Sequence, residues 1–301
     1  PEAFISSQAP DAVTDLLQTY DVAIKVRHLG SYSLYPNIVY TWNSELGYNP
    51  YFRNGRSGDE FNYLSYSNPL DVWYFGQLRN ARDMSFTVTN SETGEVTMTG
   101  GNAMKGIDVS EWQGNIDWQQ VKDSGVEFVI IRVGGRGMNE GALYTDDYAQ
   151  TYYEGASAVG LKVGAYVFAQ SVTVEEAVEE AEFVLDQVKN WDIQMPLVFD
   201  WEYSGEGVRT SNVDSRTLTD MAMAFCDTIR AAGYEPMIYF GRSQSMNMMK
   251  LEELTDYPFW LAMYSTIMDY PYKVNMWQYT DQGSVPGISG NVDLNLWFTY
   301  E

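Results

Sequence analysis

Short apolar runs alternate with amphipathic stretches of helical spacing through residues 105–301, a pattern that predicts alternating strands and helices. The expected strands are Gly106–Ser110, Glu127–Val133, Lys162–Phe168, Leu197–Glu202, Pro236–Phe240, Phe259–Tyr264, Val274–Tyr279 and Val292–Trp297. The expected helices are Ile116–Asp123, Asp146–Ala158, Thr173–Asn190, Ser215–Ala232 and Ser243–Leu254. A helix follows each of the first five strands, whereas only loops join the last three. We therefore expect an α/β fold, an irregular (β/α)5β3 TIM-like barrel whose last part is partly antiparallel.

Residues 1–99 show a different pattern, in which short aromatic runs are separated by turn residues such as Asn54-Gly55 and Thr93-Gly94. The expected strands are Val22–His28, Asn37–Trp42, Leu70–Phe75, Met84–Thr89 and Glu95–Thr99, and a short helix is expected at Asp11–Thr19. We predict a small β-rich, sandwich-like accessory domain at residues 1–99 and a linker at residues 100–104. The barrel then occupies residues 105–301.

The net charge and the scarce residue types exclude several classes of function. The chain carries 41 acidic and 18 basic residues, a formal net charge of −23, which disfavours binding to the phosphate backbone of nucleic acid. It holds one cysteine and one histidine, so its sequence offers neither a zinc cluster of these residues nor a Ser-His-Asp relay. No phosphate-binding loop motif occurs, and no apolar run is long enough for a membrane span. We therefore expect no metal and no cofactor, and carboxylates and aromatic side chains must carry any catalysis, as in glycoside hydrolysis.

Two acidic residues close one apolar run, Pro196-Leu-Val-Phe-Asp-Trp-Glu202. Side chains alternate along a strand, so Asp200 and Glu202 point to one face and Trp201 points to the other, where it packs. Alone, this triplet fits either a general acid beside a charge stabiliser or two acids that reach solvent where a strand ends. Catalytic groups of such barrels lie at the carboxyl ends of strands, and the predicted barrel brings Asp108 and Asp293 there too. This convergence favours the catalytic interpretation.

Several aromatic residues are expected at the same end of the barrel, where they would either form platforms for sugar rings or pack in the core. They are Tyr166, Phe168, Tyr264, Trp277 and Tyr279. The other acids of the barrel are interpreted as surface charge, including those on the expected solvated face of one helix. They are Asp117, Asp146, Asp147, Asp281 and the acids between Glu175 and Glu182.

Seven segments resemble, in the same order, those of the family 25 glycoside hydrolases, the lysozyme (N-acetylmuramidase) family. They are GIDVSEWQG at 106–114, FVIIRVG at 128–134, VGAYVF at 163–168, DWE at 200–202, FWLAMY at 259–264, MWQYT at 276–280 and VDLN at 292–295. The resemblance covers nearly all of residues 105–297, and residues 1–99 resemble no family that we can name. One departure is Val167, where the family often has histidine, which puts a local substrate contact in question.

The resemblance implies hydrolysis of the β-1,4 bond between N-acetylmuramic acid and N-acetylglucosamine in peptidoglycan. It implies that Glu202 is the general acid, with a raised pKa, and that Asp200 orients the 2-acetamido group of the substrate as that group attacks the anomeric carbon. It also implies that Asp108 and Asp293 position the sugar and tune the electrostatics of the site. Two alternatives stay open: a chitinase-like glycosidase of acetamido sugars, and a non-catalytic module that binds the cell wall.

The expected partner is therefore the glycan strand of peptidoglycan, with no nucleic acid and no membrane span, and we expect a monomer. A substrate of this kind implies a secreted, extracellular protein that acts at the cell wall and is of bacterial or phage origin. A chain of this size can build an adequate core without disulfides, so the single cysteine does not exclude secretion.

Overall fold

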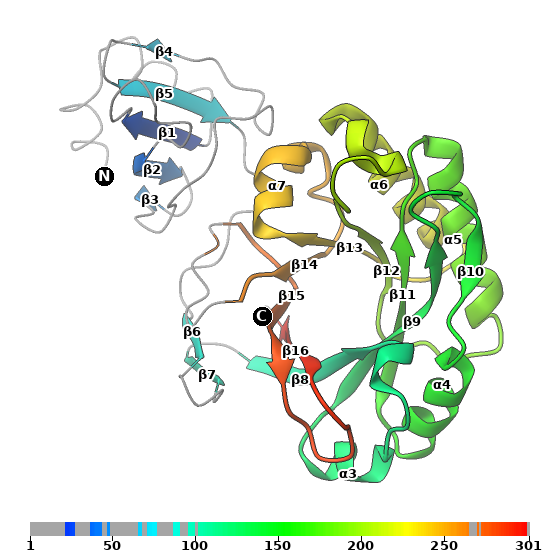
Figure 1. Ribbon diagram of the computed structural model, residues 1–301. Coiled ribbons are helices and arrows are strands. Elements are labelled where there is room, and N and C mark those ends of the chain that lie inside the picture. The colour runs from blue at the N-terminus through cyan, green and yellow to red at the C-terminus, as the bar shows by residue number, and fades with distance from the viewer. Residues whose placement is uncertain are drawn as a thin grey trace. The chain divides into compact units, whose positions relative to one another are not determined.

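The computed structural model describes residues 22–27, 37–43, 47–48, 66–67, 71–76, 87–90, 96–99, 102–264, 270 and 272–299. Eight strands in this part of the chain close into a barrel, in the order β8-β9-β11-β12-β13-β14-β15-β16 and back to β8 (Figure 1). Their bounds are β8 Asn102–Val109, β9 Phe128–Arg136, β11 Lys162–Ala169, β12 Leu197–Trp201, β13 Pro236–Gly241, β14 Phe259–Ala262, β15 Met276–Gly283 and β16 Val292–Thr299. The predicted α/β barrel is confirmed.

Strand direction explains why one predicted site residue comes from the start of a strand. Neighbouring barrel strands from β8 to β15 are parallel, whereas β16 runs antiparallel to both β15 and β8. The start of β16 therefore lies beside the carboxyl end of β8, and Asp293 pairs directly with Asp108. Both acids consequently lie at the end of the barrel where the parallel strands finish.

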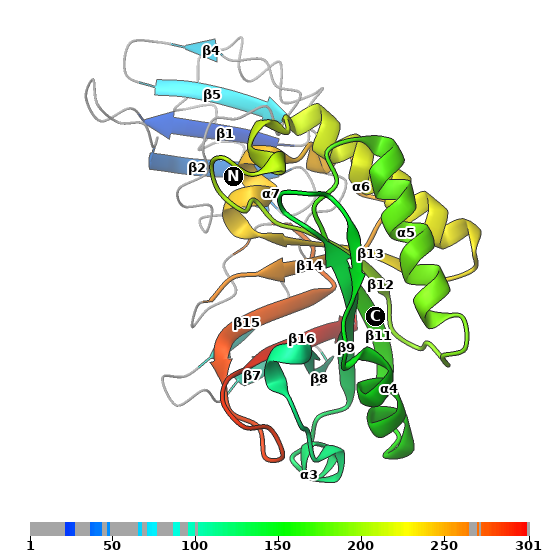
Figure 2. The same ribbon diagram turned by 45° about the vertical axis from the view of Figure 1, so that its right-hand side comes forward.

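Helices cover the outside of the barrel, and Figure 2 shows α4, α5 and α6 lying along its strands. The helix bounds are α3 Trp118–Asp123, α4 Ala149–Ala158, α5 Val174–Val188, α6 Ser215–Ala231 and α7 Arg242–Met248. Shorter elements are η1 Glu111–Gln113, β10 Leu143–Thr145, η2 Arg209–Asn212 and η3 Leu251–Glu253. The longest helix, α6, buries Leu218, Ala222, Phe225 and Ile229, whose spacing puts them on one face. Among the described residues, no helix follows β14 or β15 before the next barrel strand.

Apolar side chains fill the interior of the barrel beneath the acids. This core cluster consists of Phe128, Ile130, Met195, Val198, Met237, Tyr239, Trp260 and Met276. Packing is so close that a Cβ atom added to Gly106 would lie 2.2 Å from the ring of Phe128. Glycine is therefore required in β8 two residues before Asp108. The acids lie at one end of a closely packed barrel interior, which is typical of such barrels.

Five of the strands described before residue 100 overlap the five that the sequence predicts there, whereas β3 and β4 were not predicted. Their bounds are β1 Val22–Arg27, β2 Asn37–Asn43, β3 Gly47–Tyr48, β4 Tyr66–Ser67, β5 Asp71–Gly76, β6 Thr87–Asn90 and β7 Val96–Thr99. Strands β1 to β5 form one antiparallel sheet, and β6 pairs with β7. A sandwich stays a prediction, and the expected helix at residues 11–19 lies outside the described residues.

The predicted linker at residues 100–104 overlaps a barrel strand. Asn102, Ala103 and Met104 belong to β8 and pair with Thr299, Phe298 and Trp297 of β16. This strand begins earlier than the sequence pattern indicates because its first residues are exposed or half-buried and therefore lack the continuous apolar signature of a buried strand. Among the described helices, none combines the length and apolar character that a membrane crossing requires.

Two acids that the sequence analysis interprets as surface charge are buried, so that interpretation is wrong for them. Asp146 lies beside Arg132, and Glu180 on α5 lies beside Arg136. Each buried arginine compensates the charge of its acid, which sequence spacing does not reveal. The remaining single acids of that group, Asp117, Asp147 and Asp281, are exposed as predicted.

Candidate active site

The four predicted acids meet at one end of the barrel, each within electrostatic reach of another. Asp108 lies in β8, Asp200 in β12 and Asp293 in β16, while Glu202 is the first residue after β12. Burial raises the pKa of Asp200, of Glu202 and of Asp293, and the charge of Asp108 raises each of these pKa values further. Acids from strands far apart in sequence therefore share one local electrostatic environment, although their catalytic roles stay predictions.

Asp108 and Asp293 form a hydrogen-bonded carboxyl pair across the β8–β16 junction. Burial, the charge of Asp108 and the hydrogen bond to Asp108 together raise the pKa of Asp293 to about 9. Burial also raises the pKa of Asp108, but hydrogen bonds from Asn295, Gln278 and Asp293 oppose that rise. At neutral pH Asp293 therefore holds the shared proton and donates it to Asp108, which is the acceptor.

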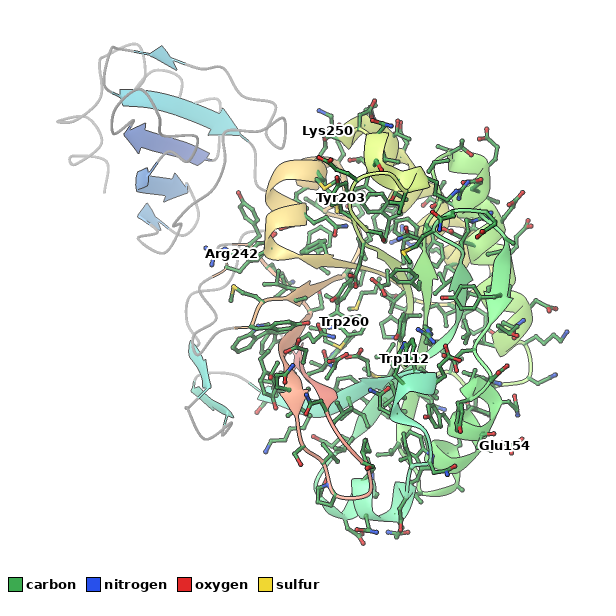
Figure 3. The ribbon with its side chains drawn as sticks, viewed as in Figure 1. Trp112, Glu154, Tyr203, Arg242, Lys250 and Trp260 are labelled. Atoms are coloured by element: carbon green, nitrogen blue, oxygen red, sulfur yellow. The ribbon has the colours of Figure 1, made fainter. Side chains whose placement is uncertain are left out.

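Two amide side chains fix the carboxylate of Asp108 from the barrel interior. The Nδ2 of Asn295 donates to Asp108 Oδ2 at 2.7 Å, and the Nε2 of Gln278 donates to the same oxygen at 2.9 Å. Asn295 is oriented in turn by Trp260, whose Nε1 donates to Asn295 Oδ1 at 2.8 Å. These residues are almost fully buried, so each donor keeps its one orientation. Figure 3 labels Trp260 toward the middle of the barrel.

Two tyrosines orient Gln278, as Trp260 orients Asn295. The hydroxyl of Tyr264 donates to Gln278 Oε1 at 2.9 Å, and that of Tyr239 donates to the same oxygen at 3.2 Å. Tyr239 is buried, whereas the Tyr264 side chain is 54% exposed. The ring of Tyr264 thus joins the buried network to the accessible surface, while its hydroxyl is already committed to Gln278.

Asp200 and Glu202 form the second carboxyl pair and occupy different environments. Asp200 is buried, and its Oδ1 has no hydrogen-bond partner, whereas Glu202 is exposed. Burial and the charges of Glu202 and Asp108 hold the pKa of Asp200 well above its usual range. The pKa of Glu202 is raised too, because the protein around it removes part of its hydration and Asp108 adds negative charge, while a hydrogen bond to Asp200 opposes this. Both carboxyl groups therefore hold a proton more tightly than isolated carboxyl groups do, and the two titrate as an interacting pair.

A braced turn, which we define as residues 110–114, follows β8 and carries Trp112. Arg132 holds it by donating to Glu111 Oε1 at 2.9 Å and to Asp146 Oδ2 at 2.8 Å. The backbone N–H of Glu111 also donates to Asp146 Oδ2, at 3.0 Å. Although the turn is fixed in this way, the side chain of Trp112 is 79% exposed. Figure 3 labels it on the turn that follows β8.

The predicted sugar platforms divide into accessible and buried residues. Tyr166 and Phe168 of β11 are half-buried, and Tyr264 is exposed. Trp277 is fully buried and donates from Nε1 to the carbonyl of Met263 at 2.8 Å, and Tyr279 is buried as well. These placements favour core packing for Trp277 and Tyr279 and leave the other three available for contact with a ligand.

Trp201 and Val167, which neighbour these residues in the sequence, also pack in the core. Trp201 is fully buried, as predicted, and its Nε1 donates to the carbonyl of Ser171 at 2.9 Å. Val167, where the resembling family often has histidine, is fully buried too. Within the described residues, no group of histidine, cysteine and acidic side chains could hold a metal ion.

The sequence model of glycosyl hydrolases family 25 matches residues 107–288, which is more than half of the chain. The chain belongs to this family. The match includes the braced turn, the Asp200–Glu202 pair and Gln278. The matched residues therefore make up most of the barrel that brings the acids together. The resemblance to family 25 is confirmed for this part of the chain.

The family 25 chain is similar to two curated lysozymes and to one lysozyme of known structure. An autolytic lysozyme of Clostridium acetobutylicum is 30% identical over 196 residues, which are 64% of this chain and 55% of the relative. Lysozyme M1 of Streptomyces globisporus is 27% identical over 208 residues, or 64% of this chain and 67% of the relative. The structure of a bacterial lysozyme from Streptomyces coelicolor has a TM-score of 0.53 and 27% identity, covering 65% of this chain and 92% of that chain. The chain thus spans just over half the length of the first relative.

Several residues of the family 25 site were missed by the sequence reasoning. Gln278 and Asn295 lie inside quoted motifs, yet their bonds to Asp108 were not predicted. Arg132 lies inside another motif, and its ion pairs with Glu111 and Asp146 were not predicted either. The available signal was that polar residues interrupt apolar strands at positions that face the barrel interior.

Replacement of Asp293 by asparagine should make stability less dependent on pH. The raised folded-state pKa of about 9 exceeds the ordinary value of 3.8, so between these pH values the folded state keeps a proton that the unfolded chain has lost. Stability therefore falls as pH rises through this window, by at most about 1.4 kcal/mol per pH unit for this group. Urea unfolding at pH 5, 7 and 9 should show a shallower decline for Asp293→Asn than for wild type. The exposed Asp147→Asn serves as the control, and parallel declines in all three proteins would contradict the assignment.

Proposed function

We propose that the chain is a peptidoglycan hydrolase that cleaves the β-1,4 bond between N-acetylmuramic acid and N-acetylglucosamine. The observation that carries the proposal is the unequal pair at the end of β12. Glu202 is exposed, with a raised pKa, while Asp200 is buried beside it with one unpartnered carboxyl oxygen. A proton donor next to a sheltered acceptor is the arrangement that hydrolysis assisted by a substrate acetamido group requires.

In the proposed first step, a proton that Asp200 and Glu202 share moves to Glu202. The substrate acetamido N–H donates to Asp200 Oδ1, which satisfies an oxygen that is buried and otherwise unpartnered. This bond favours the ionised form of Asp200, so the shared proton moves to Glu202. Glu202 then protonates the glycosidic oxygen as the acetamido oxygen attacks the anomeric carbon and the C–O bond breaks. Water subsequently opens the cyclic intermediate, and Glu202 accepts a proton from that water.

The second carboxyl pair supports this step from below. Asp108 stays an acceptor because two amides and Asp293 donate to it. Its negative charge raises the pKa of Glu202 and so helps that group to hold a proton. We propose that Asp108 and Asp293 also contact the sugar, with Tyr166, Phe168 and Tyr264 beside it.

Further features of the whole protein follow from the same proposal. We propose that it acts outside the cell, at a bacterial cell wall, as a secreted monomer. The proposed accessory domain at residues 1–99 is a small sandwich that precedes a (β/α)5β3 barrel. Names of relatives support the cell-wall setting, since they include an autolytic lysozyme and a phage lysozyme of Lactococcus phage mv1.

The activity is tested by incubating the full chain with purified peptidoglycan and, in parallel, with chitin. We expect new reducing ends from peptidoglycan, and mass spectrometry should identify them as N-acetylmuramic acid. Preferred cleavage of chitin would instead support the chitinase-like alternative. Tight wall binding without any turnover would support the non-catalytic alternative, and N-acetylglucosamine at the new reducing ends would contradict the proposed bond.

Replacement of Trp112 by alanine should weaken substrate binding more than it slows the reaction. A large aromatic face that is 79% exposed on a fixed turn, four residues after Asp108, offers a ready surface for a sugar ring. We expect KM for soluble glycan strands to rise about tenfold, equivalent to about 1.4 kcal/mol, with kcat nearly unchanged. The control is Val174→Ala, which removes another exposed apolar side chain. An unchanged KM for Trp112→Ala would exclude this contact.

A further inference from the structure

Glu202 lies where the hydrogen-bond ladder between β11 and β12 has just ended. The last pair of this ladder joins Ala169 to Trp201, so Gln170 and Glu202 leave the sheet side by side. Backbone groups beyond a ladder need other partners where water does not reach them. The carbonyl of Glu202 has such a partner, because the Nε2 of Gln170 donates to it at 3.0 Å.

The side-chain amide of Gln170 is fully buried, and every one of its hydrogen-bonding positions is used. Its second N–H donates to the carbonyl of Ala169 at 2.9 Å. Its Oε1 accepts from Ser204 Oγ at 3.0 Å and from Thr210 Oγ1 at 3.4 Å. Rotation of the amide would break these bonds with no water to replace them, so one orientation is held. The donor to Glu202 is therefore rigid.

Charged residues from three other elements hold the backbone of Gln170. Its N–H donates at 3.0 Å to Glu180 Oε1 on α5, which also accepts from Arg136 Nε of β9 at 2.9 Å. Its carbonyl accepts from Arg209 Nη1 of η2 at 2.8 Å. Glu180 is fully buried, and a buried ion pair adds little net stability compared with apolar packing. What the Arg136–Glu180 pair does supply is a fixed position for Gln170.

We propose that Gln170 is a positioning residue for Glu202, and that the Arg136–Glu180 pair serves this role by anchoring Gln170. The inference rests on the proposed function, in which Glu202 is the general acid. Gln170 bonds the backbone of Glu202 and leaves its carboxyl group free to reach the substrate. A general acid must stand within hydrogen-bond reach of the leaving oxygen, and a displacement of about 1 Å costs roughly 100-fold in rate.

Two variants separate positioning from general loss of structure. Gln170→Met keeps the side-chain length but removes all its hydrogen bonds, whereas Gln170→Glu keeps the shape and, when ionised, cannot donate to the Glu202 carbonyl. For both we expect kcat to fall about 10- to 100-fold while KM stays within about twofold. The high-pH limb of the pH–rate profile should also shift, because that limb reports loss of the proton from Glu202, whose carboxyl group would stand in a changed environment. The matched control is Gln119→Met, an exposed glutamine on α3, which should behave as wild type.

Thermal melts establish that each variant is folded at the assay temperature, and a crystal structure of a folded variant gives a readout independent of activity. We expect the Glu202 carboxyl group to be displaced in it relative to wild type. A folded variant with wild-type kcat, or with an unmoved Glu202, would overturn the proposal while leaving the general-acid role intact. If the wild type itself does not cleave peptidoglycan, the proposed function fails, and Gln170 then has no general acid to position.

Discussion

Glu202→Gln should abolish nearly all release of reducing ends from peptidoglycan while the protein stays folded. Glutamine has the shape of glutamate but cannot give a proton to the glycosidic oxygen, and general acid catalysis contributes about 10²- to 10⁴-fold. Because Glu202 is exposed, its replacement should change the free energy of unfolding by only about 0.5 kcal/mol. Initial rates on purified peptidoglycan, with thermal melts of both proteins, check the two halves of this expectation.

The matched control is Glu206→Gln, an exposed glutamate in the segment that follows β12. It removes the same charge a few residues away and should keep wild-type activity. Retention of more than a few per cent of activity by Glu202→Gln would rule out Glu202 as the general acid. The bell-shaped dependence of kcat/KM on pH should also lose its high-pH limb in the variant, since that limb reports loss of the proton from the acid.

Asp200→Asn should lose activity and gain stability. An amide cannot provide the negative charge that the proposed mechanism needs beside the acetamido group, and loss of such a stabilising group typically costs about 10²- to 10³-fold in kcat. The pKa of Asp200 in the folded state lies well above its ordinary value, so stability falls as pH rises through that range. Asparagine removes this penalty, and the variant should therefore unfold at higher temperature than wild type at pH 7 to 8.

The stability gain should disappear near pH 3, where the carboxyl group is protonated in both the folded and the unfolded chain. Asp281→Asn, which removes one exposed acid from β15, should show neither effect and serves as the control. A substrate analogue without the 2-acetamido group gives a second check, because it should be cleaved poorly by wild type and by Asp200→Asn alike. Equal activity of Asp200→Asn and wild type on peptidoglycan would contradict substrate assistance.

Much of the barrel could be predicted because its strands are buried on both faces and read as apolar runs. A strand that departs from that composition cannot be recognised in this way. The first residues of β8, Asn102 to Met104, are held by pairing with β16 and are exposed or half-buried, so nothing in their own sequence marks them as strand. Buried acids were misinterpreted for a related reason. Glu180 lies in an acid-rich helix, and only the position of Arg136 in space decides that it is buried.

The candidate site was predictable to the extent that it follows from alternation along strands. Asp200 and Glu202 were assigned to one face by the two-residue period alone. The residues that hold Asp108 were not, because Gln278 and Asn295 follow it by 170 and 187 positions and their contacts depend on the closed barrel. Gln170 was missed because its importance depends on where the ladder with β12 ends, which is a property of two strands together.

The junction between β16 and β8 gives the order in which the site can form during synthesis. Asp108 is made early, but its partners Asp293 and Asn295 lie on the last described strand. A chain that has been translated only as far as β15 can form neither the Asp108–Asp293 pair nor the bond from Asn295. Closure of the barrel and completion of this acid cluster are thus one event, so a nascent chain that still lacks β16 carries an unfinished candidate site.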